Sequence, residues 1–290
     1  MMKQALYMLL GMVLLGACGQ SYEESKRISR EQRREAARKD SAALKIAVMP
    51  TLDCLPLFVA KEEQLLDSLN GGVRLKMFNA QMDCDTALTR GRVEGMVTDI
   101  VRAKRIEQQG TALRYLTTTT AYWQLITNRL ARIHQPKQLD HKMVGMTRYS
   151  ITDSLTNYLA DTTRMARDRV FKIQLNDIFV RMQMLQNNEI DAVWLTEPQA
   201  TVVRVQKHQV IFDTRQVGMT PGRLVFRDQE MSRPEREKQQ QLLVQAWNEA
   251  CKRINERGVK HYRDVIEKYC KVKGSMVDSL PSNIRFDGIR

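Results

Sequence analysis

Long apolar runs are scarce in this chain of 290 residues. Beyond the N-terminal segment, no stretch approaches the roughly 20 consecutive apolar residues that a membrane-spanning helix needs. The sequence also lacks a nucleophile elbow, a pair of zinc ligands at typical spacing and a phosphate-binding loop. The four histidines, which are dispersed, are His134, His141, His208 and His261. We therefore expect no catalytic residue, no metal site and no cofactor.

A dense basic patch interleaved with aromatic side chains is also missing. The chain has 46 Lys and Arg against 33 Asp and Glu, a formal net charge of +13, but its basic residues are scattered. Nucleic-acid-binding surfaces concentrate such residues on one face. We expect no nucleic-acid partner, and we interpret the charge as a solvated surface with a modest attraction to anionic lipid headgroups.

The N-terminus carries the one clear apolar run. Lys3 precedes the apolar residues 5–15, and small residues follow them, an order typical of an export signal. The sequence Leu15-Gly16-Ala17-Cys18 resembles the bacterial lipobox, in which the cysteine is acylated and the signal is cut just before it. We expect a signal peptide at residues 1–17 and a lipid anchor at Cys18 that holds the protein on a bacterial membrane, facing the periplasm. An ordinary secretory signal with an incidental cysteine is the alternative.

A charged segment follows the predicted anchor. Residues 19–43 contain seven Lys or Arg and five Asp or Glu, with few apolar side chains. Such a composition buries too little surface to fold alone. Arg27 with Glu31, and Glu35 with Lys39, have the spacing that supports a transient helix. We interpret residues 18–43 as a spacer between the anchor and the folded part.

From residue 44 onward, strand-like and helix-like patterns alternate. The predicted strands are residues 44–49, 73–78, 95–99, 142–146, 171–175 and 192–195. The predicted helices between them are residues 55–69, 83–92, 150–159 and 178–186. Repeated strand–helix–strand units with short turns predict parallel strands. The sequence therefore predicts an α/β fold with two lobes, each a mainly parallel sheet flanked by helices.

Two crossings between the lobes are expected. Residues 113–128 predict two extended segments that meet near Ala121-Tyr122-Trp123, and residues 223–227 predict the return. An amphipathic helix at residues 235–257 and a further helix at residues 261–271 follow. The expected organisation is lobe 1 at residues 44–121, lobe 2 at residues 122–213, and a return to lobe 1 with C-terminal helices at residues 214–290.

The order of these segments resembles the type 2 periplasmic binding proteins. In the first lobe the likeness is carried by Ile46-Ala47-Val48, by Pro56-Leu57-Phe58-Val59-Ala60-Lys61-Glu62 and by Gly91-Arg92-Val93-Glu94-Gly95-Met96-Val97-Thr98-Asp99. In the second lobe Asn188-Glu189-Ile190-Asp191-Ala192-Val193-Trp194-Leu195-Thr196-Glu197-Pro198 resembles the family's segment G-x-x-D-A … W-x-P, with Asn188-Glu189 where relatives commonly have a glycine. The resemblance points to the branch that binds nitrate, sulfonates, taurine and thiamine-pathway pyrimidines.

This resemblance implies a function in import. Two lobes would close by hinge motion around a small molecule, and a membrane permease would read the closed form. We expect a monomeric, lipid-anchored solute-binding component of an ABC-type importer, and not an enzyme. Two alternatives remain: an envelope lipoprotein that keeps the fold for a structural or partner-binding role, and an enzyme of thiamine-pyrimidine synthesis, which the export signal disfavours.

Ligands of open α/β sheets bind outside the carboxyl ends of the strands. That rule selects three loops of the first lobe and two of the second, and we expect all five to face one cleft. The predicted ligand-binding residues are Thr51, Asp53, Asp85, Thr98, Asp99, Tyr122, Trp123, Arg148, Ser150 and Glu197. Asp53 and Ser150 serve equally as helix N-caps, and Tyr122 and Trp123 serve equally as hinge packing. Trp194 lies inside a strand and is predicted to be core.

The charges in these loops predict the kind of ligand. Acidic residues predominate, and Arg148 is the one obvious cation. An acid-rich cleft favours a cationic or amine-bearing molecule, such as an amino-pyrimidine, over nitrate or a sulfonate.

Four cysteines remain besides Cys18, an even number that suggests disulfides in an exported protein. We predict a Cys54–Cys84 bond, because both residues follow neighbouring strands. A Cys251–Cys270 bond is predicted if their helices are antiparallel. Four buried free thiols are the alternative.

Overall fold

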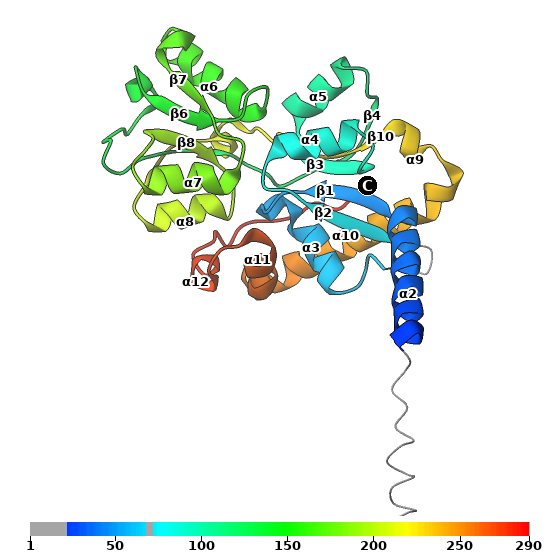
Figure 1. Cartoon of the computed structure of the whole chain (residues 1–290). Helices are drawn as coiled ribbons and strands as arrows, with labels where there is room; N and C mark the ends of the chain where they lie inside the picture. The colour runs from blue at the N-terminus through cyan, green and yellow to red at the C-terminus, as the bar shows by residue number, and fades with distance from the viewer. Residues whose placement is uncertain (1–21, 68–71, 290) are drawn as a thin grey trace, which may run out of the picture. The chain divides into compact units, whose positions relative to one another are not determined.

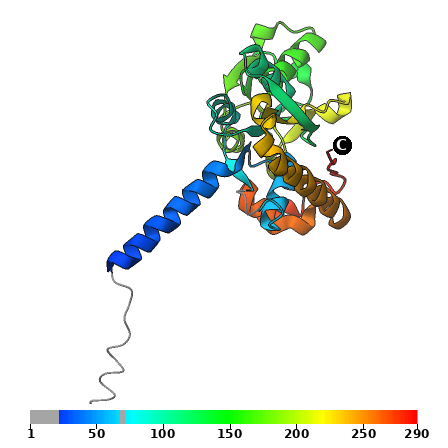
Figure 2. The same ribbon diagram turned by 90° about the vertical axis from the view of Figure 1, so that its right-hand side faces the viewer.

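The computed structural model describes residues 22–67 and 72–289, so the predicted signal peptide and Cys18 lie outside the described residues. The chain divides into two compact units, Met1–Ala43 and Leu44–Arg290. In the first unit the described residues form one helix, α2 (Tyr22–Ala42), which Figure 2 shows as a single straight rod. The segment predicted as a spacer is therefore helical over most of its length. Within the described ranges, no helix is long and apolar enough to cross a membrane.

The second unit contains two five-stranded sheets (Figure 1). The first sheet has the order β2-β1-β3-β10-β4. Its strands are β1 (Leu44–Val48), β2 (Val73–Met77), β3 (Gly95–Asp99), β4 (Leu113–Thr118) and β10 (Gly222–Arg227). Strand β1 pairs in parallel with β2 and β3, whereas β10 runs antiparallel to β3 and β4.

The second sheet repeats this arrangement with the order β7-β6-β8-β5-β9. Its strands are β5 (Gln124–Thr127), β6 (Met143–Met146), β7 (Phe171–Gln174), β8 (Ala192–Leu195) and β9 (Gln209–Asp213). Strand β6 is parallel to β7 and β8, and β5 is antiparallel to β8 and β9. The predicted two-lobed α/β fold is confirmed, but the sheets are mixed. The reason is that β5 and β10 each enter their sheet from the other lobe, at the edge where the parallel strands end.

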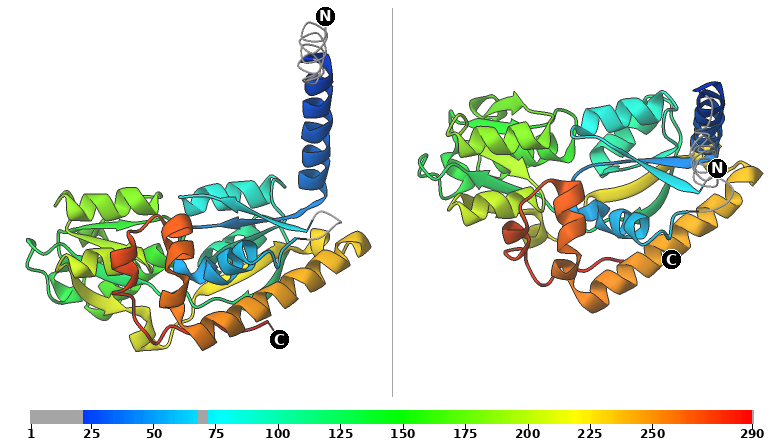
Figure 3. Two further views of the ribbon diagram at one scale, coloured as in Figure 1. Left: turned by 90° about the horizontal axis from the view of Figure 1, so that it is seen from below. Right: turned by 60° about the horizontal axis from the view of Figure 1, so that its bottom comes forward.

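Helices cover both faces of each sheet. They are α3 (Leu55–Glu62), α4 (Gln81–Thr89), α5 (Ile100–Gln108), α6 (Ile151–Thr162), α7 (Ile178–Gln186), α8 (Gln199–Val205), α9 (Asp228–Met231), α10 (Glu237–Arg257), α11 (Arg263–Cys270) and α12 (Gly274–Val277). In the first lobe, α4 and α5 lie on one face and α3 and α10 on the other (Figures 1 and 3). In the second lobe, α6 packs on one face, and α7 and α8 pack on the other.

The alternation of side chains along the strands builds these layers. In β8, Trp194 packs into the core beneath α6, while Val193 and Leu195 pack into the core beneath α7 and α8. Trp194 is fully buried, which confirms its prediction as a core residue.

The C-terminal helices contact both lobes (Figure 3). Helix α11 packs on α3 of the first lobe, where Tyr269 stacks on Phe58 with ring centroids 4.5 Å apart, and α12 packs on α8 of the second. The amide of Gln199 in α8 donates to the carbonyl of Pro50 at 2.7 Å. These contacts hold the two lobes beside one another behind the cleft.

Candidate functional site

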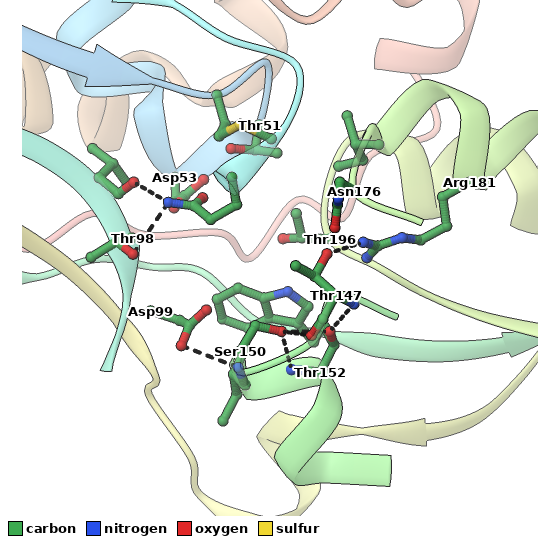
Figure 4. Close-up of a pocket in the computed structure, with 16 residues that line it drawn as sticks. Thr51, Asp53, Thr98, Asp99, Thr147, Ser150, Thr152, Asn176, Arg181 and Thr196 are labelled. Carbon is green, nitrogen blue, oxygen red and sulfur yellow. Dashed lines mark hydrogen bonds between the residues drawn. The ribbon is translucent and has the colours of Figure 1, made fainter. Parts of the chain in front are cut away.

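A cavity of about 70 Å³ lies between the lobes, at the carboxyl ends of β1, β3, β6 and β8 (Figure 4). Its polar lining residues are Thr51, Asp53, Gln81, Thr98, Asp99, Thr147, Ser150, Thr152, Asn176, Arg181 and Thr196. One water molecule needs about 10–15 Å³ of cavity volume measured in this way, so the cavity could hold roughly five to seven waters. In this conformation the cavity suits a solute of few non-hydrogen atoms.

Six of the ten predicted ligand-binding residues line this cavity. They are Thr51, Asp53, Thr98, Asp99, Trp123 and Ser150. They come from both lobes, as the rule on strand ends predicts. The structure places the other four predicted residues, Asp85, Tyr122, Arg148 and Glu197, outside the lining of this cavity.

Asp85 is bound by a neighbouring helix. Its carboxylate forms an ion pair with Arg102 of α5, whose side chain is 5% exposed. Burial raises the pKa of Asp85, and the Arg102 charge opposes that rise. The Arg102 guanidinium also donates to the backbone carbonyl of Arg148 at 3.3 Å, while the Arg148 side chain is exposed. Asp85 therefore helps to tie α4 to α5.

Glu197 and Tyr122 bind each other where the chain crosses between the lobes. The Tyr122 hydroxyl donates to Oε1 of Glu197 at 2.9 Å, and Arg204 pairs with the same oxygen at 2.8 Å. Oε2 accepts from the backbone and the hydroxyl of Thr201. The Arg215 guanidinium stacks on the Tyr122 ring, 3.9 Å from its centroid. For Tyr122 these contacts favour hinge packing, and a small second hollow beside Glu197 adjoins the cavity at Asp53.

Among the acids that line the cavity, Asp53 has a buried oxygen without a hydrogen-bond partner in the described residues. The residue is 8% exposed, and its Oδ1 has no hydrogen-bond partner in the part of the chain that the structure describes. Oδ2 accepts from the Thr119 hydroxyl at 3.4 Å. Burial raises the pKa of Asp53. The Asp53 side chain does not cap α3, so it remains available as an acceptor in the cavity.

Asp99 ends β3 and caps α5. Its Oδ1 accepts from the backbone N–H groups of Val101 at 2.9 Å and Arg102 at 3.0 Å. The same oxygen accepts the N–H of Ile151, the first residue of α6 in the other lobe, at 3.1 Å. Burial raises the pKa of Asp99 to about 6, and the N–H donors act in the opposite direction. The carboxylate thus joins the two lobes directly.

Ser150 caps α6, as one of its two predicted roles requires. Its hydroxyl oxygen accepts from the N–H of Thr152 at 3.1 Å, and its own hydroxyl donates to the carbonyl of Thr147 at 2.7 Å. A side-chain oxygen in this position satisfies one of the free donors at a helix start.

Arg181 is the charged cavity residue that sequence reasoning missed, and the polar lining residues Gln81, Thr147, Thr152, Asn176 and Thr196 were also not predicted as ligand-binding residues. It lies in α7, is 6% exposed, and donates to the carbonyls of Leu175 and Trp194, both at 3.0 Å, and to the Thr147 hydroxyl at 2.5 Å. It forms no ion pair with any described carboxylate, and burial lowers its pKa to about 10. The signal in the sequence was a single cation within the apolar segment Ile178-Phe179-Val180-Arg181-Met182.

The charge balance of the cavity follows from these three side chains. Asp53 and Asp99 face it from the first lobe and Arg181 from the second. Burial raises the pKa of both carboxyl groups, and hydrogen-bond donors oppose that rise at each of them, joined at Asp99 by the Arg102 charge. Within the described residues no group of three His, Cys, Asp or Glu side chains could hold a metal ion.

The two predicted disulfides are wrong. Cys54, Cys84, Cys251 and Cys270 are buried free thiols. Cys54 packs in the core beneath α3, whereas Cys84 packs in the core beneath α4, on the opposite face of the sheet. Although the two thiols follow neighbouring strands, they therefore lie in different cores, one on each face of the sheet. The Cys251 thiol is directed to the carbonyl of Asp287 at 3.5 Å.

These thiols are expected to be unreactive in the folded protein. Burial raises the pKa of all four, that of Cys251 to about 12, and the thiolate is the reactive form. In a variant that begins after Cys18, Ellman's reagent should label no thiol before unfolding and four after it. Fewer than four labelled thiols in denaturant without reductant would contradict the free state.

Comparisons with known proteins agree with this fold. No protein-family model matches the sequence, and no curated protein sequence matches it. The ligand-binding component of an ABC-type import system from Staphylococcus aureus, solved with zinc bound, is 18% identical with a TM-score of 0.70, over 85% of this chain and 86% of that chain. The alkanesulfonate-binding protein of Xanthomonas axonopodis pv. citri, bound to MOPS, is 15% identical with a TM-score of 0.70, over 83% and 85%. The nitrate-binding protein of Synechocystis PCC 6803 is 14% identical with a TM-score of 0.67, over 81% and 68%. The predicted periplasmic-binding-protein fold is therefore confirmed, and at these identities the likeness shows the fold alone.

Proposed function

We propose that this protein is the solute-binding component of an ABC-type importer, anchored to the bacterial envelope through a lipid on Cys18, and that it captures a small amine-bearing molecule between its lobes. The observation that carries this proposal is the buried Oδ1 of Asp53, which has no hydrogen-bond partner among the described residues and lines the interlobe cavity. The shared fold supports the role in import.

The charge of the cavity supports an amine over an anion. A buried carboxylate without a partner is costly, and a ligand N–H or ammonium group would supply the missing donor. Asp53 and Asp99 offer two negative charges against the one positive charge of Arg181. An amino-pyrimidine or a comparable nitrogenous molecule fits this balance, whereas the named ligands of two neighbouring structures are a sulfonate and nitrate.

Closure follows from contacts with both lobes. A ligand shifts the open–closed equilibrium only through interactions that differ between the two states. A solute that binds Asp53 and Thr98 of the first lobe together with Asn176 and Thr196 of the second would make such contacts. The closed form would then be the one that a permease recognises.

The test begins with the protein purified without added solute. Mass spectrometry should identify a co-purifying amine, and calorimetry with a panel of amino-pyrimidines and alkylamines should show binding, accompanied by compaction in small-angle scattering. Asp53→Asn should weaken that binding about 10- to 100-fold, since bonds to charged groups contribute about 1.5–3 kcal/mol. Glu249→Gln, at an exposed ion pair outside the cleft, is the matched control and should bind normally.

Opposite results would reject the proposal in defined ways. Binding of sulfonates without binding of any amine would reject the ligand class. A protein that neither binds nor compacts with any solute would instead have a structural or partner-binding role in the envelope.

The proposed ligand class predicts a pH dependence. Because burial raises the pKa of Asp99 to about 6 and also raises that of Asp53, an ammonium ligand should displace protons from the cavity as it binds. The affinity of the ligand should therefore be highest near neutral pH and fall as the pH drops below about 6, by up to about tenfold per pH unit for each proton that the ligand must displace. Calorimetry of an alkylamine in buffers of different ionisation enthalpy measures the released protons. An affinity that is constant from pH 7 to pH 5 would contradict this linkage.

A further inference from the structure

The first turn of α6 lines the interlobe cavity and presents backbone N–H groups of a helix start there. The helix is 12 residues long, and Ser150, Ile151 and Thr152 at its start all line the cavity. Free N–H groups and the positive end of the helix dipole make such a helix start favourable for an anion. In this chain an anion is already present, because Oδ1 of Asp99 accepts the Ile151 N–H at 3.1 Å (Figure 4).

We propose that Asp99 is the specificity-determining residue of the cleft: its carboxylate occupies the anion-binding position at the start of α6 and thereby excludes oxyanion ligands. The inference rests on the proposed solute-binding function. This role of Asp99 would explain how a protein that shares its fold with sulfonate- and nitrate-binding proteins binds a different class of ligand. One side chain of the protein would occupy the position of the anion.

The donors around Asp99 support this assignment. Three backbone N–H groups from two helices converge on a single oxygen: those of Val101 and Arg102 in α5 and that of Ile151 in α6. Asp99 is 4% exposed. An oxyanion entering the cavity would compete for the Ile151 N–H and would lie against a carboxylate, and both effects disfavour it.

Two other buried side chains of the cavity, Arg181 and Asp53, independently support this role of Asp99. Arg181 lines the cavity and forms no ion pair among the described residues, although the Asp177 charge acts on it and its guanidinium donates to two carbonyls and the Thr147 hydroxyl, so a positive charge is present in the lining. Asp53, 8% exposed, presents an oxygen without a donor. Asp99 therefore supplies a negative charge at the start of α6, and the cavity keeps one acceptor oxygen without a partner in the described part of the chain, on Asp53.

The hydrogen bond from the Ile151 N–H to the Asp99 carboxylate also links the two lobes. Asp99 belongs to the end of β3 in the first lobe, and Ile151 begins α6 in the second. A bound anion that closes a cleft must contact both sides. Here the Asp99 carboxylate, a part of the protein, makes the contact between the two lobes. Closure of the cleft therefore needs no anionic solute.

The test compares oxyanion binding in matched variants. Asp99→Ser keeps a good N-cap for α5, but its hydroxyl is uncharged and too short to reach Ile151 across the cleft. Asp53→Asn removes one negative charge from the same cavity without vacating the start of α6. Calorimetry with methanesulfonate and with nitrate, at constant ionic strength, should show no binding to the wild type or to Asp53→Asn. Asp99→Ser should bind at least one of these anions, with an affinity at least about tenfold above the weakest binding that the same calorimetry detects.

Each other outcome has a defined meaning. The inference is overturned if the wild type binds these anions as tightly as Asp99→Ser, if Asp53→Asn gains as much, or if Asp99→Ser binds neither anion while its circular dichroism remains native. Asp99→Asn, which keeps the side-chain shape but removes the charge, is the second variant if the serine protein is unfolded. It should show a measurable gain in anion affinity, smaller than that expected for serine because its amide still fills the position, and no gain would overturn the inference. Amine binding by the wild type is measured separately, so its failure would reject the ligand proposed above without affecting the result for Asp99.

Discussion

Replacing Glu197 with alanine is expected to lower the free energy of unfolding by about 3–5 kcal/mol, because it removes one partner of a buried ion pair. Glu197 is 1% exposed and accepts from Tyr122, Arg204 and Thr201. The substitution leaves the Tyr122 hydroxyl without its acceptor and the Arg204 charge without its carboxylate, although Arg204 still donates to Gln124 and Thr201. Urea denaturation followed by circular dichroism measures the change.

Controls separate this effect from the loss of any acidic side chain. Glu249→Ala breaks a partly exposed ion pair with Arg253 four residues along α10 and should lower the free energy of unfolding far less than Glu197→Ala. Tyr122→Phe combined with Glu197→Ala should cost less than the two single changes added together, since both remove the same hydrogen bond. A cost for Glu197→Ala below about 1 kcal/mol would show that the crossing does not depend on this network.

Trp194→Ala is expected to cost about 3–5 kcal/mol, the range for deleting a large aromatic side chain from a core. Trp194 is fully buried, its indole N–H donates to the Thr156 hydroxyl at 2.9 Å, and its ring meets that of Phe212 edge-on at 5.9 Å. The substitution opens a cavity between β8 and α6 and leaves the Thr156 hydroxyl without this donor. Thermal and urea unfolding should both show the loss.

The conservative change Trp194→Phe separates the contribution of aromatic packing to the free energy of unfolding from that of the hydrogen bond. Trp194→Phe keeps an aromatic ring beside Phe212 but removes the N–H donor, so it should cost less than half as much as alanine. Trp123→Phe, at a half-buried residue of the cavity lining, is the control for changing a tryptophan elsewhere in this lobe. If Trp194→Phe were as destabilising as Trp194→Ala, the hydrogen bond to Thr156 rather than packing would carry the stability.

The first turn of α6 shows how side chains decide what occupies the backbone donors that a fold provides. The backbone donors of a helix start are fixed by the fold, since every α-helix leaves its first N–H groups unpaired. What occupies them is decided by side chains, and here the occupant comes from β3 of the other lobe. A ligand class is therefore set by the identity of a few residues at strand ends.

Local patterns determined much of the architecture. The apolar strands 44–49 and 192–195, the helix at 178–186 and the long helix near 235–257 correspond to β1, β8, α7 and α10. Each of these segments buries one face, so its apolar residues recur with the period of a helix or a strand. That period can be recognised from neighbouring residues in the sequence. Helix α5 was not predicted, although Asp99 caps it, because its segment Ile100–Gln108 carries three cations and reads as polar.

The cysteines show where such reasoning stops. Cys54 and Cys84 both follow strands of one sheet, and sequence position alone placed them together. Helices α3 and α4 cover opposite faces of that sheet, so the two thiols point into separate cores. The face that a connecting helix takes depends on the handedness of the crossover and on packing, which no local pattern records.

By itself the sequence determined the alternation of strands and helices, the two-lobed order and the strand ends from which polar residues would approach a ligand. Only the tertiary structure decided which of these residues meet. It paired Asp85 with Arg102 and Glu197 with Arg204, brought Arg181 to the cavity, and set Asp99 against the start of α6. The physical reason is that the charge of a cleft depends on pairings between residues far apart in the chain, and these pairings are made only when the lobes come together.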